Sequence, residues 1–451
     1  MMGQDMVMAT TASQITAIEK QPSTYSFEPF LDIMYADFAQ VHPQRKPFLW
    51  QRPSEGSKEL FPNPKKLPPS ILGVGMLHQQ LQRPDLLHGY MSKSLSATNK
   101  ALEWESIHPN SILASSEELK VVSLDNIVCE TLFDAQTTSF FGPYLLKLEP
   151  NLLFTLKDWD LNSWRVSYKL PSFLAGQATG PRGQMIDVLT QYFSAPAHLR
   201  SGCVPFINEV YAEYKQAGLS DRDIGGIIFT ILWGLNLNVI IITFWMVAHI
   251  MSNPRIMEEI RQEIAPMMEF LQNREDNGDT FAEVTKTHLL NGSPILNSIF
   301  NETLRHTSMG NSFRKTSQDT LLEGRDIPAN TIIIIPQRPQ LMDPAAFGKD
   351  HDTFDFYRFV NDKSLLRKGE FRPFGGGTTM CGGRIAGRHQ ILAFTAIIFW
   401  RYDLEMISPD QEILGVQGKA FPRLDETLLS IGASKARKGD DMILKMRPRN
   451  L

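Results

Sequence analysis

The longest apolar run of the chain extends from Ile224 to Ile250 and reads IGGIIFTILWGLNLNVIIITFWMVAHI. As one helix it would span roughly 40 Å, which is long enough to cross a membrane. Glycine and amide residues interrupt the run, and no asymmetry of basic residues frames it. The interrupting residues are Gly225, Gly226, Gly234, Asn236 and Asn238. The run therefore favours a buried central helix over a membrane span.

Composition supports a large folded core around such a helix. Of the 451 residues, 42% are hydrophobic and 21% are charged, which is typical of globular proteins and more apolar than disordered chains. The length fits either two domains or one large domain. With 45 basic and 49 acidic residues, the formal charge of −4 provides no global positive field, so we expect no nucleic-acid partner.

Further elements follow from local patterns. Asn253-Pro254 and Ser293-Pro294 are each typical of a helix start, because proline is tolerated at the first helical position. Ser115 and Glu118 form a capping-box pattern before an apolar stripe, which predicts a helix directly after them. The β-branched run TIIIIP at 331–336 predicts a buried strand. Together these elements predict a mainly α fold with small β-sheets.

The N-terminal part differs in composition. Residues 42–70 contain seven prolines, whose fixed φ and missing N–H discourage regular structure. We therefore predict an irregular, proline-rich lead-in over residues 1–70 and a single domain over residues 71–451. The first residues contain no apolar stretch long enough for a signal peptide or an anchor.

Cysteine usage narrows the chemistry. Cys129, Cys203 and Cys381 are far apart and show no C-x-x-C spacing, which argues against a disulfide framework or a structural zinc site. Cys381 follows three consecutive glycines, 375–377, and precedes an apolar helix in FRPFGGGTTMCGGRIAGRHQILAF. Unpaired N–H groups at a helix start stabilise a thiolate, so we expect a lowered pKa and a metal ligand here. The alternative is a buried structural cysteine beside a turn.

The spacing of residues in this loop matches a known sequence pattern. Phe374, Gly377, Cys381 and Gly383 match the pattern F-x-x-G-x-x-x-C-x-G, and the segment resembles the haem-binding loop of cytochromes P450. The resemblance implies the cytochrome P450 fold, with haem (iron protoporphyrin IX) as the cofactor and Cys381 as its axial thiolate. It also implies that Phe374 packs beside the haem, and that Gly377 and Gly383 permit the close turn.

A second match lies upstream of the cysteine. Glu302 and Arg305 are three residues apart on a predicted helix, so they share one face. Their place before Cys381 resembles the family's K-helix motif, which implies a structural triad completed by Arg358. The family's usual proline in that later loop is replaced by Phe356.

Groups for the haem propionates are less clearly marked. Relatives often place an arginine for a propionate where this chain has Arg314, and guanidinium suits carboxylate. An ordinary surface arginine is the alternative. Two positions before the cysteine, where the family commonly has a basic residue, this chain has Thr379. Upstream candidates for the same role are His78, Arg83 and His88.

The resemblance also assigns a role to the long apolar helix. In most relatives this helix carries glycine and then an acid and a threonine, whereas here the aligned residues are Gly234, Leu237 and Asn238. Gly234 and Asn238 are therefore the catalytic candidates. LWGLNLNVIIITFW resembles the branch that contains sterol 7α-hydroxylases and prostacyclin synthase, which has asparagine at this position. The alternative for Asn238 is that it only satisfies a backbone group in the core.

The resemblance implies a monooxygenase that oxidises a hydrophobic terpenoid, sterol or polyketide-like molecule in secondary metabolism, with electrons from an NADPH-cytochrome P450 reductase. Two alternatives stay open: a redox-independent haem-thiolate isomerase or dehydratase, and a truncated haem-binding relative without catalysis. Family habit implies peripheral association with the endoplasmic reticulum membrane, and the polar N-terminus leaves a cytoplasmic protein open. A basic patch around Cys381 is a candidate surface for the redox partner. Its members are Lys363, Arg367, Lys368, Arg372, Arg384 and Arg388.

Overall fold

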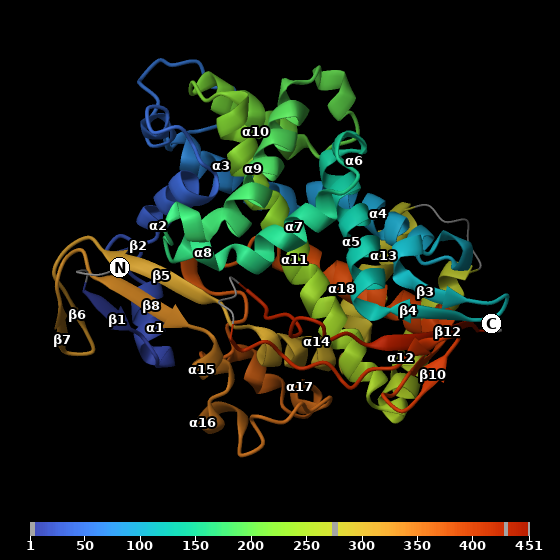
Figure 1. Ribbon diagram of the computed structural model, residues 1–451. Helices are drawn as coiled ribbons and strands as arrows, with labels where there is room; N and C mark the ends of the chain where they lie inside the picture. Colours follow the sequence, from blue (N-terminus) through green and yellow to red (C-terminus); the bar gives the residue numbers. More distant parts are fainter. Residues whose placement is uncertain (1–4, 273–277, 428–431, 450–451) are drawn as a thin grey trace.

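The computed structural model describes residues 5–272, 278–427 and 432–449. Helices form most of the molecule, and small sheets lie at two of its edges (Figure 1). The mainly α fold predicted from the sequence is confirmed.

The central helix is α11, Asp221–Met251. Ser220 caps its N-terminus and forms a capping box with Asp223. By length and composition α11 could cross a membrane, but 67% of its most apolar window is buried inside the protein. It packs against α5, α9, α14 and α18, so the prediction of a buried central helix is confirmed.

Two of the α11 glycines allow this close packing. A Cβ on Gly225 would lie 2.9 Å from the backbone nitrogen of Thr190 in α9, and a Cβ on Gly226 would lie 1.9 Å from the carbonyl oxygen of Ala39. Any larger residue would push neighbouring backbone away, because backbone atoms cannot rotate aside as side chains do. These glycines therefore serve helix packing.

Longer helices surround α11 on several sides. They are α3 (Pro69–Gln82), α4 (Pro84–Ala101), α5 (Leu124–Phe141), α7 (Leu152–Asn162), α9 (Ser172–Ser194), α10 (Pro205–Gln216), α12 (Pro254–Gln272), α14 (Pro294–Thr307) and α18 (Arg384–Arg401). Shorter helices are α1 (Ala12–Glu19), α2 (Glu28–Ile33), α6 (Tyr144–Leu148), α8 (Trp164–Ser167), α13 (Gly278–Val284), α15 (Arg338–Leu341), α16 (Pro344–Phe347) and α17 (Arg358–Asn361). The predicted starts of α12 and α14 at their prolines are confirmed.

Two four-stranded sheets accompany the helices. The first has the order β1-β8-β5-β2, formed by β1 (Met6–Met8), β8 (Ile332–Pro336), β5 (Asn311–Thr316) and β2 (Tyr25–Ser26). The second has the order β3-β4-β12-β9, formed by β3 (Ile112–Ser115), β4 (Lys120–Ser123), β12 (Ile443–Pro448) and β9 (Tyr402–Met406). Two hairpins are β6 (Thr320–Leu322) with β7 (Arg325–Ile327), and β10 (Glu412–Ile413) with β11 (Val416–Gln417).

The prediction of an irregular lead-in over residues 1–70 is wrong for most of its length. β1 pairs in parallel with β8, β2 pairs with β5, and α1 and α2 lie between and after these strands (Figure 1). Tyr35 and Phe38, in a π-helical turn (Met34–Phe38), are buried in the main core. The proline-rich part, residues 42–70, does lack long elements. The two strands escaped prediction because their partners, Ile332 for Met6 and Thr316 for Tyr25, are far away in the sequence and leave no local signal.

The helix predicted directly after Ser115 is also absent. Ser115 ends β3, the N–H of Ser116 donates to the carbonyl of Leu119 at 2.7 Å, and β4 follows. Helix α5 begins later, at Leu124, where the Ser123 side chain accepts from the N–H of Asn126. The pattern misled because serine is favoured in turns as well as at helix starts.

A half-buried histidine, His249, and a buried one, His389, make stability depend on pH. Burial lowers the pKa of His249 to about 3, helped by repulsion from His306, and burial lowers that of His389 to about 4. Both imidazoles titrate near pH 6.5 when unfolded, so between about pH 6.5 and 4 the unfolded chain binds more protons.

We therefore expect the free energy of unfolding to fall as the pH falls through this window, by up to about 1.4 kcal/mol per pH unit for each histidine. Denaturant unfolding at a series of pH values measures the slope. His249 stacks on Phe354 with ring centroids 3.7 Å apart, so H249F keeps a ring there and should reduce the slope. An H249F slope equal to that of the wild type would contradict the assignment.

Candidate functional site

Cys381 lies directly before α18, whose N-cap is Gly383. The backbone N–H groups of Gly383 and Arg384 at the helix start favour its thiolate form. Burial has the largest influence and raises the pKa of the Cys381 thiol, while these N–H groups and the Arg384 charge act in the opposite direction. The predicted lowering of this pKa is therefore wrong in its net direction, because protein surrounds much of the sulfur and desolvation disfavours the thiolate.

Cys381 is nevertheless the most accessible of the three cysteines. It is exposed, whereas Cys203 is half-buried and Cys129 is buried. The Cys129 sulfur lies 3.5 Å from a carboxylate oxygen of Asp125 and 3.6 Å from the ammonium nitrogen of Lys157. Cys129 therefore belongs to a polar contact between α5 and α7, and Cys381 has a sulfur that a ligand can reach.

The glycines before the cysteine serve two different purposes. Gly375 and Gly377 have φ angles of 68° and 60°, in the left-handed region that favours glycine. Gly376 is extended, but a Cβ there would lie 2.1 Å from a carboxylate oxygen of Glu19. The loop therefore approaches α1 as closely as glycine allows. The N–H of Cys381 closes the turn by donating to the carbonyl of Phe374 at 3.0 Å.

Two more glycines lie around the sulfur. A Cβ on Gly383 would lie 3.9 Å from the Cys381 sulfur, and a Cβ on Gly382 would lie 2.5 Å from the ring of His78. Of the upstream candidates, the structure thus brings His78 of α3 to the loop. Arg83 instead forms a surface ion pair with Asp85, at 2.6 Å.

His88 lies on α4. His78 is the upstream candidate whose ring lies against Gly382 of the cysteine loop.

Arg314 meets the loop from β5. Its side chain is buried, donates to the Thr379 hydroxyl and to the carbonyl of Phe313, and lies over the ring of Phe27. The surface alternative for Arg314 is therefore wrong. Thr379, at the position where relatives commonly carry a basic residue, binds this arginine instead.

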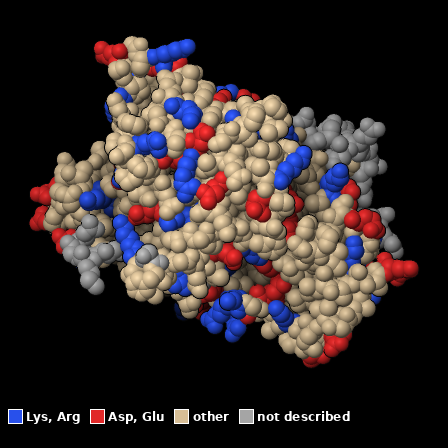
Figure 2. Space-filling view, turned by 45° about the horizontal axis from the view of Figure 1, so that its top comes forward, with Lys and Arg blue, Asp and Glu red and all other residues tan. Residues whose placement is uncertain are grey.

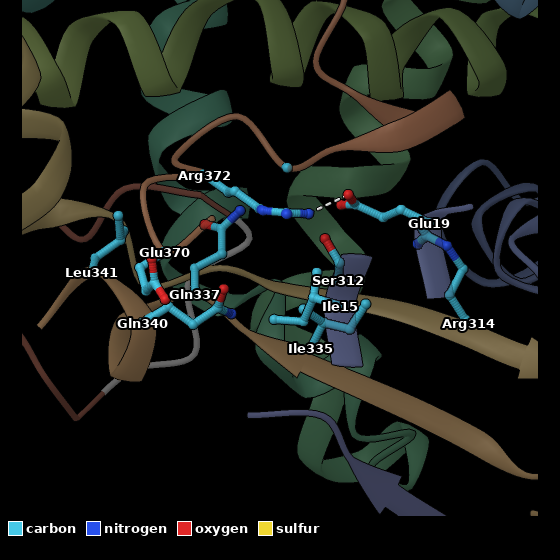
Figure 3. Close-up of a pocket in the computed structure, with 11 residues that line it drawn as sticks. Ile15, Glu19, Ser312, Arg314, Ile335, Gln337, Gln340, Leu341, Glu370 and Arg372 are labelled. Atoms are coloured by element: carbon cyan, nitrogen blue, oxygen red, sulfur yellow. Dashed lines mark hydrogen bonds and ion pairs between the residues drawn. The ribbon is translucent and has the colours of Figure 1, made fainter. Parts of the chain in front are cut away.

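A small pocket lies beside this contact, between α1, β5, β8 and the cysteine loop (Figure 3). Arg372 donates to the Glu19 carboxylate across one side of it, and Glu19 lies between Arg372 and Arg314 in this view. Arg314, Glu19 and Arg372 thus form an alternating row of charges along the loop. Such a row holds α1 to the loop through opposite charges.

Glu302, Arg305 and Arg358 form one buried cluster. Arg305 donates twice to the Glu302 carboxylate, at 2.7 and 2.8 Å, and Arg358 donates to it at 3.1 Å. Arg305 also donates to the carbonyls of Leu341 and His351, at 3.0 and 2.6 Å. The cluster therefore ties α14 to the chain that leads toward the cysteine loop.

Charge balance keeps this glutamate ionised. Burial alone would raise the pKa of Glu302, but hydrogen bonds and charges from Arg305 and His306 outweigh it and lower the pKa to about 2. Glu302 and Arg305 have no exposed side-chain surface, so solvent does not screen the pair.

Gly234 and Asn238 form an exposed stripe on the otherwise buried α11. A Cβ on Gly234 would meet no atom within 4 Å. Leu237 is 6% exposed and belongs to the core, so no acid stands where most relatives have one. A Cβ on Gly387 of α18 would lie 3.4 Å from Val239, so the helix that follows Cys381 crosses α11 beside Asn238.

Asn238 also has a structural contact. Its carboxamide oxygen accepts from the N–H of Ala433 at 3.0 Å. A Cβ on Gly432 would lie 2.2 Å from the same oxygen. The alternative that Asn238 satisfies a backbone group therefore has a geometric basis, although the group is an N–H of another segment. With its oxygen engaged, the carboxamide has its NH₂ donors to offer a ligand.

The basic patch is smaller than the sequence suggested. Arg372 binds Glu19, Arg388 binds Asn297 and the carbonyl of Leu290, and Lys368 binds the carbonyl of Ala346. Lys363 and Arg367 are exposed, and Arg384 donates to the carbonyl of Cys381 at 2.9 Å. On the face shown in Figure 2, basic and acidic side chains are interspersed, in keeping with the small net charge.

Sequence reasoning missed Glu19. This residue lies more than 350 positions before the loop that it contacts, so no local pattern could connect them. The run of three glycines was the available signal, since Gly376 is required by a neighbour and not by its own φ angle.

Comparison with known proteins identifies the family. The family model for cytochrome P450 matches residues 184–423, more than half of the chain. The cytochrome P450 monooxygenase nodJ of Hypoxylon pulicicidum is 26% identical, over 74% of this chain and 66% of its own length. Cytochrome P450 7A1 of Oryctolagus cuniculus is 29% identical, over 39% of this chain and 38% of its own.

The cholesterol 7-alpha-monooxygenase of Cricetulus griseus is 27% identical, over 39% of this chain and 38% of its own length. The chain thus spans less than two thirds of the length of each of these relatives. The resemblance to sterol 7α-hydroxylases agrees with the last two relatives. From the matched cysteine loop, the buried central helix and the family model together, this chain belongs to the cytochrome P450 family.

Proposed function

We propose that this chain is a haem-thiolate monooxygenase that oxidises a hydrophobic small molecule of the terpenoid, sterol or polyketide-like class. The Cys381 loop carries the proposal, since it combines an exposed cysteine before a helix start with a left-handed glycine, Gly377, in the family's spacing. Monooxygenases among the fungal and mammalian relatives support the reaction class. A role in secondary metabolism is part of the proposal.

The residues present fit an iron porphyrin bound through sulfur. Thiolate is a known axial ligand of haem iron, and the glycine at 383 adds no side chain beside the Cys381 sulfur. Arg314 would pair with a propionate, and Phe374 and Gly377 would face the ring. When bound, the haem supplies the oxygen chemistry.

Protein side chains would then bind and orient the substrate on the opposite side. Gly234 leaves room beside α11, and Asn238, one helical turn later, offers NH₂ donors on the same face. The donors would bind an oxygen of the substrate or a water, and the apolar neighbours Leu235 and Ile231 would contact its hydrocarbon part.

Substitution of Asn238 tests this role. N238D keeps the oxygen that accepts from Ala433 but replaces the NH₂ donors, whereas N238A removes both groups. If the donors act on the ligand, both variants lose about tenfold or more in kcat/KM, the size expected for one hydrogen bond made in the transition state. Steady-state kinetics of the wild type and both variants measures this loss in kcat/KM. An N238D variant with wild-type kcat/KM would assign Asn238 to the Ala433 contact alone.

Electron supply decides the reaction type. We propose an NADPH-cytochrome P450 reductase as partner, bound electrostatically near Lys363, Arg367 and Arg384. Turnover of a panel of terpenes, sterols and aromatic polyketides is measured with and without NADPH and reductase. A monooxygenase requires both; full turnover without electrons would overturn this proposal.

A specific observation favours the second candidate, a redox-independent isomerase or dehydratase. Leu237 is buried where most relatives carry an acid, so α11 provides no carboxyl group for proton delivery at that position. Organic peroxide substrates supplied without NADPH test it, and rearranged products without electron consumption are the expected result. Recovery of the peroxide unchanged contradicts this candidate.

Membrane contact remains part of the proposal. Family habit suggests peripheral association with the endoplasmic reticulum, and α11, the helix long and apolar enough to span a membrane among the described residues, is mostly buried. Fractionation after a carbonate wash checks this: a peripheral protein is released into the supernatant. Retention in the pellet would contradict peripheral association.

A further inference from the structure

Asp160, near the end of α7, joins three segments around the stripe formed by Gly234 and Asn238. One carboxylate oxygen accepts from the indole N–H of Trp233 at 2.8 Å. The other oxygen accepts from the ammonium group of Lys435. Trp233 directly precedes Gly234 on α11, and Lys435 lies two residues after Ala433, the partner of Asn238.

The base of this arrangement is rigid. Trp233 packs edge-to-face on Trp159 with ring centroids 5.3 Å apart, and stacks on Phe38 at 5.9 Å. Trp159 is fully buried and directly precedes Asp160. Aromatic packing thus fixes the position of the carboxylate before it meets Lys435.

The segment 432–436 is otherwise attached to α11, to α14 and to residues 424–425, where the N–H of Asp425 donates to the carbonyl of Lys435 at 2.9 Å. Ala433 donates to Asn238, the indole of Trp245 donates to the carbonyl of Ser434 at 2.9 Å, and the N–H of Ser434 donates to the carbonyl of Thr307 at 2.8 Å. Lys435 is the residue of this segment that reaches α7. Asp160 therefore completes a ring of contacts that runs from α11 to α7 and back through segment 432–436.

Solvent can reach this contact. The side chain of Lys435 is 34% exposed and that of Asp160 is 18% exposed, whereas Trp233 is 7% exposed. Partly exposed ion pairs are weak, so the bond to Lys435 can open while the bond to Trp233 persists. The pair has the properties of a latch and not of a core contact.

We propose that Asp160 is a positioning residue, which holds α7 and segment 432–436 together beside the Gly234 and Asn238 face and so limits the size of the ligand that fits there. The part that concerns the ligand rests on the proposed function. The latch itself, a coupling between Asp160 and Lys435 that orders segment 432–436, does not depend on haem.

Two variants break the contact between Asp160 and Lys435 and keep the aromatic packing of Trp233 and Trp159. In D160N the amide oxygen still accepts from Trp233, but the charge that holds Lys435 is lost. K435M keeps a flexible side chain and removes the ammonium group. K445M is the matched control, because Lys445 pairs with Glu405 on the second sheet, outside segment 432–436.

Hydrogen–deuterium exchange of the full chain tests the latch. D160N and K435M should raise exchange of peptides covering 432–436, the double variant should match the single ones, and K445M should match the wild type. Unchanged exchange in both single variants, or additive effects in the double variant, would overturn the latch.

Two probes of different size test the effect on the site. Imidazole and the bulky azole clotrimazole are titrated spectroscopically into the haem-loaded protein. Loss of the contact between Asp160 and Lys435 should raise the affinity for clotrimazole by about fivefold, an effect on the order of 1 kcal/mol. The affinity for imidazole should stay unchanged. Equal ratios of the two affinities in wild type, D160N and K435M would overturn the role in ligand size. Absence of any azole spectrum in the wild type would overturn the proposed function, while the exchange result would still decide the latch.

Discussion

Replacing Cys381 with alanine is expected to abolish the thiolate-type Soret band of the reduced protein under carbon monoxide. Alanine offers the iron no donor atom, and this band depends on sulfur ligation. The Cys381 side chain takes little part in the core, since the residue is exposed. We therefore expect C381A to keep the circular dichroism of the wild type while it loses the band.

Cys129 and Cys203 provide matched controls. C129A and C203A remove a thiol of the same kind from a buried and a half-buried position, and both should retain the band. A band that survives in C381A would mean that another residue ligates the iron. A wild-type protein without the band would overturn the haem assignment as a whole.

The second large effect concerns stability. E302Q is expected to lower the free energy of unfolding by about 3–5 kcal/mol, because it leaves the guanidinium group of Arg305 buried without its carboxylate partner. It also removes one of the two carboxylates that Arg358 contacts, while Asp350 remains. The N–H of Asp355 donates to one Glu302 oxygen at 3.0 Å, and the amide oxygen of glutamine is still able to accept this bond. Unfolding by guanidinium chloride, followed by circular dichroism, measures the change in the free energy of unfolding.

A surface ion pair gives the control for E302Q. Arg423 pairs with Asp440 at 2.9 Å, and its side chain is 66% exposed, so R423Q should cost less than about 1 kcal/mol. E302D keeps the charge and should fall between the two, which preserves the test if E302Q fails to fold. An E302Q protein as stable as R423Q would show that the buried cluster contributes little.

Local spacing was enough to predict much of this molecule. The four fixed positions around Cys381 and the pair formed by Glu302 and Arg305 each lie within one short segment. The structure brings Arg358 to the same carboxylate, although the sequence alone gave it only by resemblance. The burial of α11 was predicted from the glycine and asparagine residues that interrupt its apolar run, although its length fits a membrane span.

Contacts between distant segments could not be predicted in the same way. Gly376 contacts Glu19, and Asn238 contacts Ala433. Both contacts form only because segments near the two ends of the chain pack against its central part. The prediction of a lowered pKa for Cys381 was wrong for a related reason. A helix start is visible in sequence, whereas the amount of protein around the sulfur, which dominates the shift, is not.

The pairing of β1 with β8 has a consequence for synthesis on the ribosome. Met6 pairs with Ile332, so the first strand is made long before its partner exists. At about 5–20 residues per second, that interval is roughly 15 to 65 seconds. During this time Met6–Met8 has unpaired backbone groups. Arg372, the ion-pair partner of Glu19, is synthesised later still. The nascent N-terminal segment is thus open to wrong strand pairing for most of synthesis, and its contact with the cysteine loop forms only after Arg372 has been made.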